Sequence, residues 1–464
     1  MKKGLIILSV IVVCAGVGVI LYFNSCAYLN KKADKLFLQD EFEQAASLYQ
    51  KSVDKGDGYA CYKLGELYLR GVGVDSVDKE KAFNLFETGS EKGCIEAQAR
   101  VALCYLYGTG IEEDKDKGAE ILNNLFETTN NTFVKSWMGI FYITGEFEFW
   151  PKDVKKAISL FQECAEHNDV AARSLGIIYF FGEYETVDYN KALYYYKLAD
   201  SLGSSSVQRN LGSIYLHGEG NVSQNKKKAI YYYEKGVKRG DTDCLLCLYS
   251  FYTFDDKYKD ERRALSYLNK AIDWKSGKAC FFMGNNYMDG SYGLPKDDEK
   301  AFEFFKKSAQ YGDPNGMNSL GVIYFNGIGT ERDLTLAEKY YKEAANKGNS
   351  YAALNLYYNI TTGIFNGTEA DAKKYFKMAL DKNNVDALKM WARQYITGRP
   401  IFQDDVIYVQ PQQAFSNMKA AADQGDAEAC ATIAEWYERG YGCNMNKAEA
   451  ERYRNMVGVE KKPW

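Results

Sequence analysis

Histidine and proline are scarce in this chain, which has two His and six Pro among 464 residues. The two histidines, His167 and His217, stand far apart in the sequence, so they predict neither a shared metal site nor a catalytic base. The motifs GxxxxGK[ST], GxGxxG, HExxH and GxSxG are absent, and with them the usual signatures of nucleotide binding and hydrolysis. We therefore expect no cofactor, no metal and no enzymatic activity.

No charge of either sign dominates, because 58 basic and 62 acidic side chains leave a net charge of −4. A chain without a basic field has little attraction for nucleic acid, so we expect no nucleic-acid partner. A repeated pairing of cysteines is also missing. Cys244 and Cys247 are three residues apart but fall within a predicted helix, where they cannot easily bridge, and the Cys residues between 61 and 443 otherwise lack the spacing of a zinc site or a disulfide framework. We interpret most of them as buried thiols, which weakens the case for an oxidising compartment.

Long hydrophobic runs are absent after the N-terminus. Residues 4–23 follow Lys2 and Lys3 and contain few polar side chains. This run is long enough to span a bilayer as a helix and longer than the apolar core of a cleavable signal peptide. We expect residues 1–29 to form a single-pass membrane anchor, with the rest of the chain in the periplasm or outside a bacterial inner membrane. Acylation of Cys26, as in a lipoprotein, is the alternative.

A tyrosine-marked repeat is what the chain has in abundance. Segments such as KLGELYLRG from Lys63, SLGIIYFFG from Ser174 and SLGVIYFNG from Ser319 recur with a period near 36 residues. Eleven copies place a Tyr at one position, namely Tyr68, Tyr105, Tyr142, Tyr179, Tyr215, Tyr252, Tyr287, Tyr324, Tyr358, Tyr395 and Tyr437. So narrow a spacing predicts an array of similar units.

Small residues flank the Tyr of most copies. Three residues before it, nine of the eleven copies have Gly or Ala, which predicts the close approach of a neighbouring helix. Three residues after it, nine have Gly, as expected where a helix ends in the left-handed conformation. A second amphipathic stretch follows, such as KALYYYKLADSLG from Lys191. Each copy therefore predicts a hairpin of two helices, A and B, that is buried by stacking on its neighbours.

Three copies depart from the pattern. The sixth has Tyr249 and Asp255 where the others have small residues, and the ninth has Asn355 and Thr361. The tenth has a longer loop that begins at Arg399. We interpret these departures as sequence drift rather than as irregular stacking.

The pattern LGxxYxxG, loop, KAxxYYxKAAxxG resembles the Sel-1-like repeat, a variant of the tetratricopeptide (TPR) helix pair. The resemblance covers residues 30–457 and leaves 458–464 as a C-terminal tail, with 31–57 as a first hairpin that caps the array. It implies an all-α, right-handed α/α superhelical solenoid of about eleven Sel-1-like, TPR-like helix pairs, preceded by one N-terminal transmembrane helix.

The resemblance also implies a function, because relatives serve as membrane-complex adaptors, secretion and envelope factors, and host-interaction proteins. We expect a membrane-anchored scaffold that binds a protein or peptide partner. The alternative is a binding factor for envelope polysaccharide or peptidoglycan. A penicillin-binding or β-lactamase-like hydrolase is a third hypothesis, since SxxK occurs at Ser223 and Ser416, but these copies fall in different repeats.

By resemblance to TPR arrays, the A helices line a concave groove that receives the partner. Counted from the small residue before the Tyr, the groove positions lie three residues before it, one after it and five after it. They predict the partner groove Tyr62, Arg173, Arg209, Phe281 and Lys389; Glu66, Ser213, Asn285, Arg393 and Glu435; and Tyr107, Phe181, His217, Phe254, Asp289 and Asn326.

Overall fold

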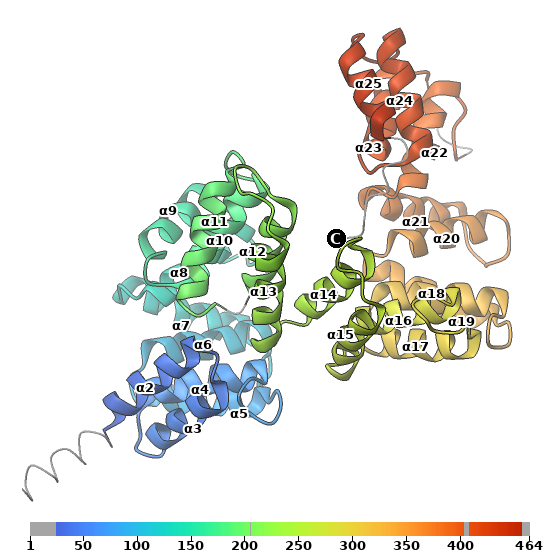
Figure 1. The fold of residues 1–464 in the computed structure, drawn as a ribbon. Coiled ribbons are helices and arrows are strands. Elements are labelled where there is room, and N and C mark those ends of the chain that lie inside the picture. The colour runs from blue at the N-terminus through green and yellow to red at the C-terminus, as the bar shows by residue number, and fades with distance from the viewer. Residues whose placement is uncertain (1–24, 205, 403–407, 457–464) are drawn as a thin grey trace, which may run out of the picture. The chain divides into compact units, whose positions relative to one another are not determined.

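The computed structural model describes residues 25–204, 206–402 and 408–456. Within these residues the chain forms 24 helices and no strand, and successive helices pair as A–B hairpins (Figure 1). The predicted all-α repeat array is therefore confirmed. The hairpins form two compact units whose boundary falls between Leu245 and Leu246, inside α14 (Thr242–Phe254).

The first unit contains α2 (Cys26–Leu38), α3 (Phe42–Val53), α4 (Gly58–Arg70), α5 (Lys79–Glu91), α6 (Ile95–Tyr107), α7 (Lys115–Thr128), α8 (Thr132–Thr144), α9 (Val154–Cys164), α10 (Asp169–Phe181), α11 (Tyr189–Ser201), α12 (Gln208–His217) and α13 (Lys226–Lys238). The second contains α15 (Glu261–Asp273), α16 (Gly277–Asp289), α17 (Asp298–Gln310), α18 (Pro314–Asn326), α19 (Leu334–Asn346), α20 (Ser350–Thr361), α21 (Glu369–Asp381), α22 (Val385–Thr397), α23 (Pro411–Ala422), α24 (Ala427–Arg439) and α25 (Lys447–Met456). Even numbers mark A helices and odd numbers mark B helices.

In six of the pairs, the small residue of the A helix is a glycine that lies against an aromatic ring of the B helix. A Cβ atom on Gly176 would lie 2.5 Å from the ring of Tyr196, and one on Gly321 would lie 2.5 Å from that of Tyr341. Both rings are almost completely buried. Interiors packed at crystal-like density have no room for the extra carbon, so the expected close approach of the helices is confirmed.

The marker Tyr joins the two helices of a pair through its ring and through its carbonyl group. Tyr179 stacks on Tyr195 with ring centroids 5.8 Å apart, and the Lys191 amine lies over the Tyr179 ring at 4.7 Å, a favourable cation–π distance. The carbonyl of Tyr179 accepts a hydrogen bond from the backbone N–H of Asp188. The Asp188 side chain in turn caps α11 by accepting from the N–H groups of Asn190 and Lys191.

The glycine after the marker Tyr ends the A helix as expected. Gly71 and Gly327 have φ values of 63° and 70°, and each donates its N–H to the carbonyl four residues earlier. Residues with a Cβ atom pay a steric penalty in this left-handed conformation, and glycine does not.

The sixth pair reverses the sizes of the two packing residues. Tyr249 occupies the small position and is buried, and its hydroxyl donates to Asn286 Oδ1 at 3.1 Å. On α15, Tyr267 stacks on Tyr252, and the next residue is the fully buried Leu268, where six other pairs have the ring that lies against a glycine. The division into two units falls in this same pair.

The ninth pair corrects one marker. Helix α20 is capped by Asn349, and its left-handed glycine is Gly363, so the register places Tyr357 at the small position. Tyr357 is buried against Phe376 with ring centroids 4.9 Å apart, whereas Tyr358, the marker that we predicted, is 43% exposed. The count from one Tyr to the next fails here because Ile360, and not a Tyr, stands three residues before the left-handed glycine Gly363.

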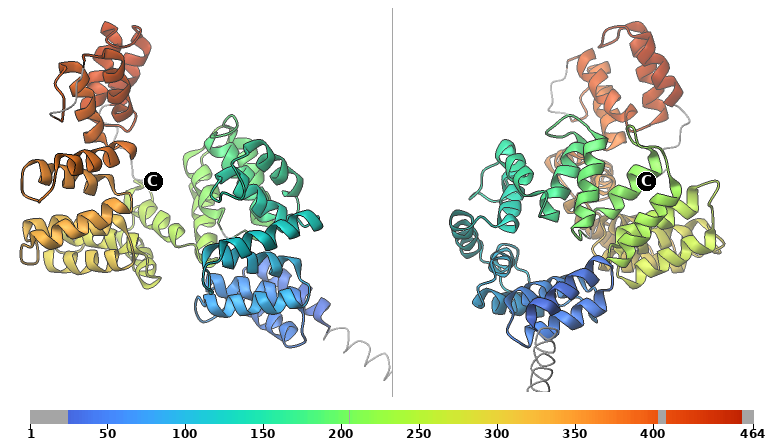
Figure 2. Two further views of the ribbon diagram at one scale, coloured as in Figure 1. Left: turned by 180° about the vertical axis from the view of Figure 1, so that it is seen from behind. Right: turned by 60° about the vertical axis from the view of Figure 1, so that its left-hand side comes forward.

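The first unit closes on itself through Arg239, as its hairpins follow a curve (Figure 2). The Arg239 guanidinium, 5% exposed, donates to Asp40 Oδ1 at 2.7 Å, to Asp200 Oδ1 at 3.0 Å and to the Ser204 carbonyl at 2.6 Å. Residues 199 positions apart are thereby joined. Beside this contact, the Phe37 ring would meet a Cβ on Gly203 at 3.0 Å.

All ten described cysteines are thiols, and six of them are buried. Burial raises the pKa of Cys104, Cys164 and Cys280 to about 11. Thiols with raised pKa values stay protonated and unreactive near neutral pH. The interpretation of the cysteines as small core residues is confirmed.

The two ends of the chain lie outside the described residues. The predicted membrane anchor, up to residue 24, and the predicted tail at 458–464 belong to these parts. Helix α2 begins at Cys26, with Leu29 buried. None of the helices in the described part is long and apolar enough to cross a membrane.

Enlarging the small position should destabilise its helix pair. We expect Gly321→Leu to lower the stability of the second unit by roughly 2 kcal/mol, because the side chain overlaps the Tyr341 ring. Adding Tyr341→Leu copies the size reversal of the sixth pair and should recover part of the loss. Urea unfolding followed by far-UV circular dichroism measures both, and a double variant no more stable than Gly321→Leu would contradict the packing argument.

Removing the Arg239 guanidinium should open the first unit. We expect Arg239→Met to speed backbone amide exchange in α2 and α3 by at least tenfold, because Asp40 loses its partner and a buried ion pair is costly to break from one side. Hydrogen exchange read by mass spectrometry tests this. Arg209→Met is the control, since Arg209 and its partner Asp243 are each about half exposed, and it should leave α2 and α3 unchanged.

Candidate functional site

The A helices lie on the inner side of the curve in both units. Successive A helices, such as α4 with α6 and α16 with α18, contact each other directly, whereas B helices of neighbouring hairpins contact each other less. A stack that is tighter along one row of helices curves toward that row. The groove positions therefore belong to an inner, concave face in each unit.

A buried ion pair occupies the concave face of the first unit. Glu66 of α4 is 7% exposed and accepts from the Arg100 guanidinium of α6 at 2.8 Å. Arg70 approaches the same carboxylate at 3.5 Å, and the Arg100 guanidinium also lies over the Phe133 ring at 5.1 Å. Although burial opposes it, the Glu66 carboxylate raises the pKa of Arg100. Glu66 thus joins α4 to α6 instead of facing a partner.

Helix α10 brings further charges toward α4. Burial lowers the pKa of Arg173, Asp169 opposes this shift and Arg70 adds to it. Burial also lowers the pKa of Lys63, which lies over the Phe37 ring at 4.7 Å. Shifts of this kind mark charged groups held close together in a partly dry space.

An apolar pocket opens between α8 and α10 on this face. It has a volume of about 460 Å³ and is lined by Ile140, Ile143, Thr144, Lys152, Phe161, Arg173, Ser174, Ile177, Ile178, Phe181, Glu183 and Tyr184. Ile177 is 39% exposed and Phe181 is 65% exposed. Lys152 closes the rim by donating to the Tyr184 hydroxyl at 3.2 Å. A pocket of this size with apolar walls and a few polar groups is typical of ligand sites.

Several predicted groove residues connect one A helix to the next. Arg173 donates to Ser206 Oγ at 3.1 Å, and Arg209 pairs with Asp243. Both donors stand three residues before the small position. Asp243 lies in the first turn of the following A helix, and Ser206 lies two residues before the following A helix. These side chains stabilise the stack as well as facing the groove.

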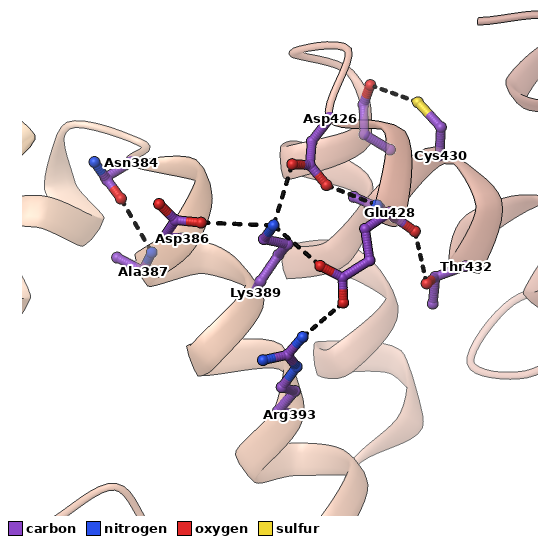
Figure 3. Close-up of polar contacts among 11 residues, drawn as sticks. Asn384, Asp386, Ala387, Lys389, Arg393, Asp426, Glu428, Cys430 and Thr432 are labelled. Atoms are coloured by element: carbon purple, nitrogen blue, oxygen red, sulfur yellow. Dashed lines mark hydrogen bonds and ion pairs between the residues drawn. The ribbon is translucent and has the colours of Figure 1, made fainter. Parts of the chain in front are cut away.

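The same connection is most extensive between α22 and α24 (Figure 3). Lys389 donates to Asp426 and to Glu428, both at 3.1 Å, and Arg393 donates to Glu428 at 2.6 Å. Burial opposes the charge on Lys389, but these hydrogen bonds raise its pKa above the usual value. Lys389 and Arg393 therefore already have partners within the second unit.

The remaining predicted residues lie on A helices without forming one compact site. Tyr107 donates to Glu146 at 3.0 Å, and half-buried Tyr62 packs edge-on against Phe133. The Phe281 ring packs against Phe305. Ser213, Phe254 and Asn285 are half-buried, whereas His217, Asp289, Asn326 and Glu435 are exposed. In the first unit only Arg173 and Phe181, among the predicted residues, line the pocket.

Sequence reasoning missed the isoleucines of the pocket. Ile140 and Ile177 occupy the position one residue after the small residue, where the prediction named only polar side chains such as Ser213. An apolar residue at a position that is polar in other repeats was a usable signal, because exposed apolar groups mark interaction sites.

Removing the shared carboxylate should destabilise the first unit. We expect Glu66→Gln to cost roughly 3 kcal/mol, because Arg70 and Arg100 lose their buried counter-charge. The midpoint of urea unfolding measures the change. Glu113→Gln is the matched control, since its pair with Lys115 is about half exposed on both sides and should contribute less than about 0.5 kcal/mol. Equal effects of the two variants would contradict the assignment of a structural role to Glu66.

Comparison with family models adds an independent finding. A model described as the Sel1 repeat matches ten segments, at residues 38–57, 58–94, 95–123, 136–169, 170–204, 205–241, 251–273, 277–313, 314–349 and 395–426. Together they cover more than half of the chain.

Curated proteins and solved structures are similar to this chain at low identity. The chain is 27% identical over 342 residues to the chitin synthase regulator SKT5 of Saccharomyces cerevisiae, covering 71% of this chain and 47% of that protein. It is 22% identical to chitin synthase regulatory factor 4 of Schizosaccharomyces pombe, covering 72% and 42%. The chain thus spans less than half the length of both relatives. A Sel1 repeat protein from Oxalobacter formigenes matches with a TM-score of 0.44 at 23% identity, covering 67% of this chain and 88% of that one.

Proposed function

The chain belongs to the Sel1 repeat family, and on that premise we propose that it is a membrane-tethered scaffold that binds a segment of a partner protein. Sel1 repeat proteins act as protein-interaction scaffolds and are typically non-enzymatic. The binding surface that we assign is the concave face of the first unit, between α8 and α10.

The apolar pocket is the observation that supports this assignment. Its exposed side chains, Ile177 and Phe181, lie on the inner row of helices next to the half-buried Arg173. Aromatic, aliphatic and arginine side chains around a pocket supply most of the binding energy in protein interfaces. Solenoids use their concave faces for such contacts because neighbouring repeats extend one continuous surface.

The tether is proposed from the sequence. Residues 4–23 form an apolar run preceded by two lysines, which is the pattern of an uncleaved anchor. We propose a single-pass protein with its repeats in the periplasm or outside the cell. A reporter fused at the C-terminus and assayed on both sides of the membrane tests this topology, and mass spectrometry of the N-terminus distinguishes the anchor from a chain acylated at Cys26.

A second candidate is a factor associated with envelope polysaccharide. Two relatives are named as regulators of chitin synthase, an enzyme that makes a cell-wall polymer. This candidate predicts that the repeat domain binds chitin or peptidoglycan fragments on a glycan array. The scaffold hypothesis predicts a protein partner and no such binding.

Substituting the exposed apolar side chains of the pocket should weaken binding of the partner. We expect Phe181→Ser and Ile177→Asp to reduce the recovery of partner proteins from detergent-solubilised membranes about tenfold or more, because each removes apolar contact worth about 1–2 kcal/mol. Quantitative mass spectrometry after affinity capture measures this. Tyr231→Ser is the control, because Tyr231 is 58% exposed on the B helix α13 and lies off the concave face. Proteins captured equally by all variants would contradict the proposal.

A further inference from the structure

Arg173 marks one end of the pocket with a charge that its surroundings do not fully balance. Arg70 shares the Glu66 carboxylate with Arg100 and lowers the pKa of Arg173, so the three guanidinium groups lie on the same part of the concave face of the first unit. Glu66 and Asp169 are the carboxylates that act on them, and the pocket adds one charge of each sign, Lys152 and Glu183. Glu66 is engaged by both Arg70 and Arg100, so Asp169 is the carboxylate left for Arg173.

Lys63 does not change this balance. Its amine is influenced by Asp34 as well as by Glu66 and Asp169, so Lys63 and Asp34 together add no net charge. One positive charge remains in excess, within a protein whose net charge is −4. Unbalanced charge in a partly dry space attracts an anion more strongly than the same charge in water does.

Two buried N–H donors of this face lack an acceptor among the described residues. They are Arg173 Nε and Trp137 Nε1, on the neighbouring helices α10 and α8. Arg173 donates through its Nη1 atom to Ser206, but its buried Nε has no acceptor in the described part of the chain. A buried donor without an acceptor costs about 1–3 kcal/mol. Arg173 lines the pocket whereas Trp137 does not, so an acceptor bound in the pocket would recover this cost at Arg173.

The rest of the pocket is apolar. Its walls include Ile140, Ile143, Ile177 and Phe181, and its floor includes the fully buried Phe161. A volume of about 460 Å³ suits a bulky apolar side chain together with the backbone beside it. Apolar walls next to one unbalanced guanidinium favour a ligand that carries both kinds of group.

We propose that the pocket binds an acidic–apolar peptide segment, in which a bulky aliphatic or aromatic side chain enters between α8 and α10 and a nearby carboxylate pairs with Arg173. This inference rests on the proposed function and names the chemistry of the partner. A polyanion fits less well, because Asp169 and the pocket residue Glu183 would repel a second and third negative charge.

Selection from a random twelve-residue peptide library displayed on phage tests the proposal with the full chain. We expect the enriched peptides to be acidic and to place Leu, Ile, Phe or Met within four residues of Asp or Glu. Repeating the selection on Arg173→Gln should remove the acidic enrichment while keeping the apolar residues. The proposal would be overturned if the enriched peptides were neutral or basic, if no peptide were enriched, or if the acidic enrichment were unchanged on Arg173→Gln.

Anisotropy titration of the most enriched peptide then measures the contribution of the charge. We expect Arg173→Gln to weaken binding at least tenfold and Arg173→Lys to restore part of it. Arg262→Gln is the control, because Arg262 is exposed on the B helix α15 and lies outside the pocket, and it should change binding less than twofold. Equal losses for Arg173→Gln and Arg262→Gln would also overturn the proposal.

The two proposals fail in different ways. Partner capture that depends on Phe181, combined with peptides that show no acidic preference, rejects the acidic–apolar motif and keeps the scaffold. Capture that is independent of Phe181 rejects the binding surface itself.

Discussion

The spacing of the two helices in a pair depends on an aromatic ring that lies where a side chain is missing. Gly176 and Gly321 allow the rings of Tyr196 and Tyr341 to approach the A-helix backbone. The marker Tyr179 can then stack on Tyr195, which precedes Tyr196 on the B helix, and its ring contacts the amine of Lys191. If the helices were farther apart, Tyr179 could not stack on Tyr195, and the Asp188 N–H at the end of the loop could not reach the Tyr179 carbonyl.

Curvature follows from the contacts between pairs. Successive A helices contact one another, whereas the B helices of neighbouring pairs contact each other less, so each stack curves toward its row of A helices. Side chains one residue after the small position consequently point into the concave face. The residue type at this position decides whether the side chain is available to a partner. Glu66 pairs with Arg100 and joins α4 to α6, whereas Ile177 remains exposed.

The sequence predicted the features that repeat and missed those that occur once. Gly321 and Tyr324 recur with a fixed spacing, so their roles follow from the repeat pattern alone. Glu66 was assigned to the groove because the repeat pattern does not reveal that Arg100 of the next helix approaches it. Tyr358 was misassigned because the cap residues Asn349 and Gly363, rather than the interval between tyrosines, set the register of α20.

The contact between Asp40 and Arg239 changes how the first unit should fold. In an open array each repeat touches only its neighbours, so stability is nearly a sum of local terms and folding can spread from any repeat. A bridge across 199 residues adds a term that exists only when all the intervening hairpins are in place. Forming it requires closing a long loop, which slows folding. The first unit thus gains the all-or-none character of a globular domain while keeping the architecture of a repeat.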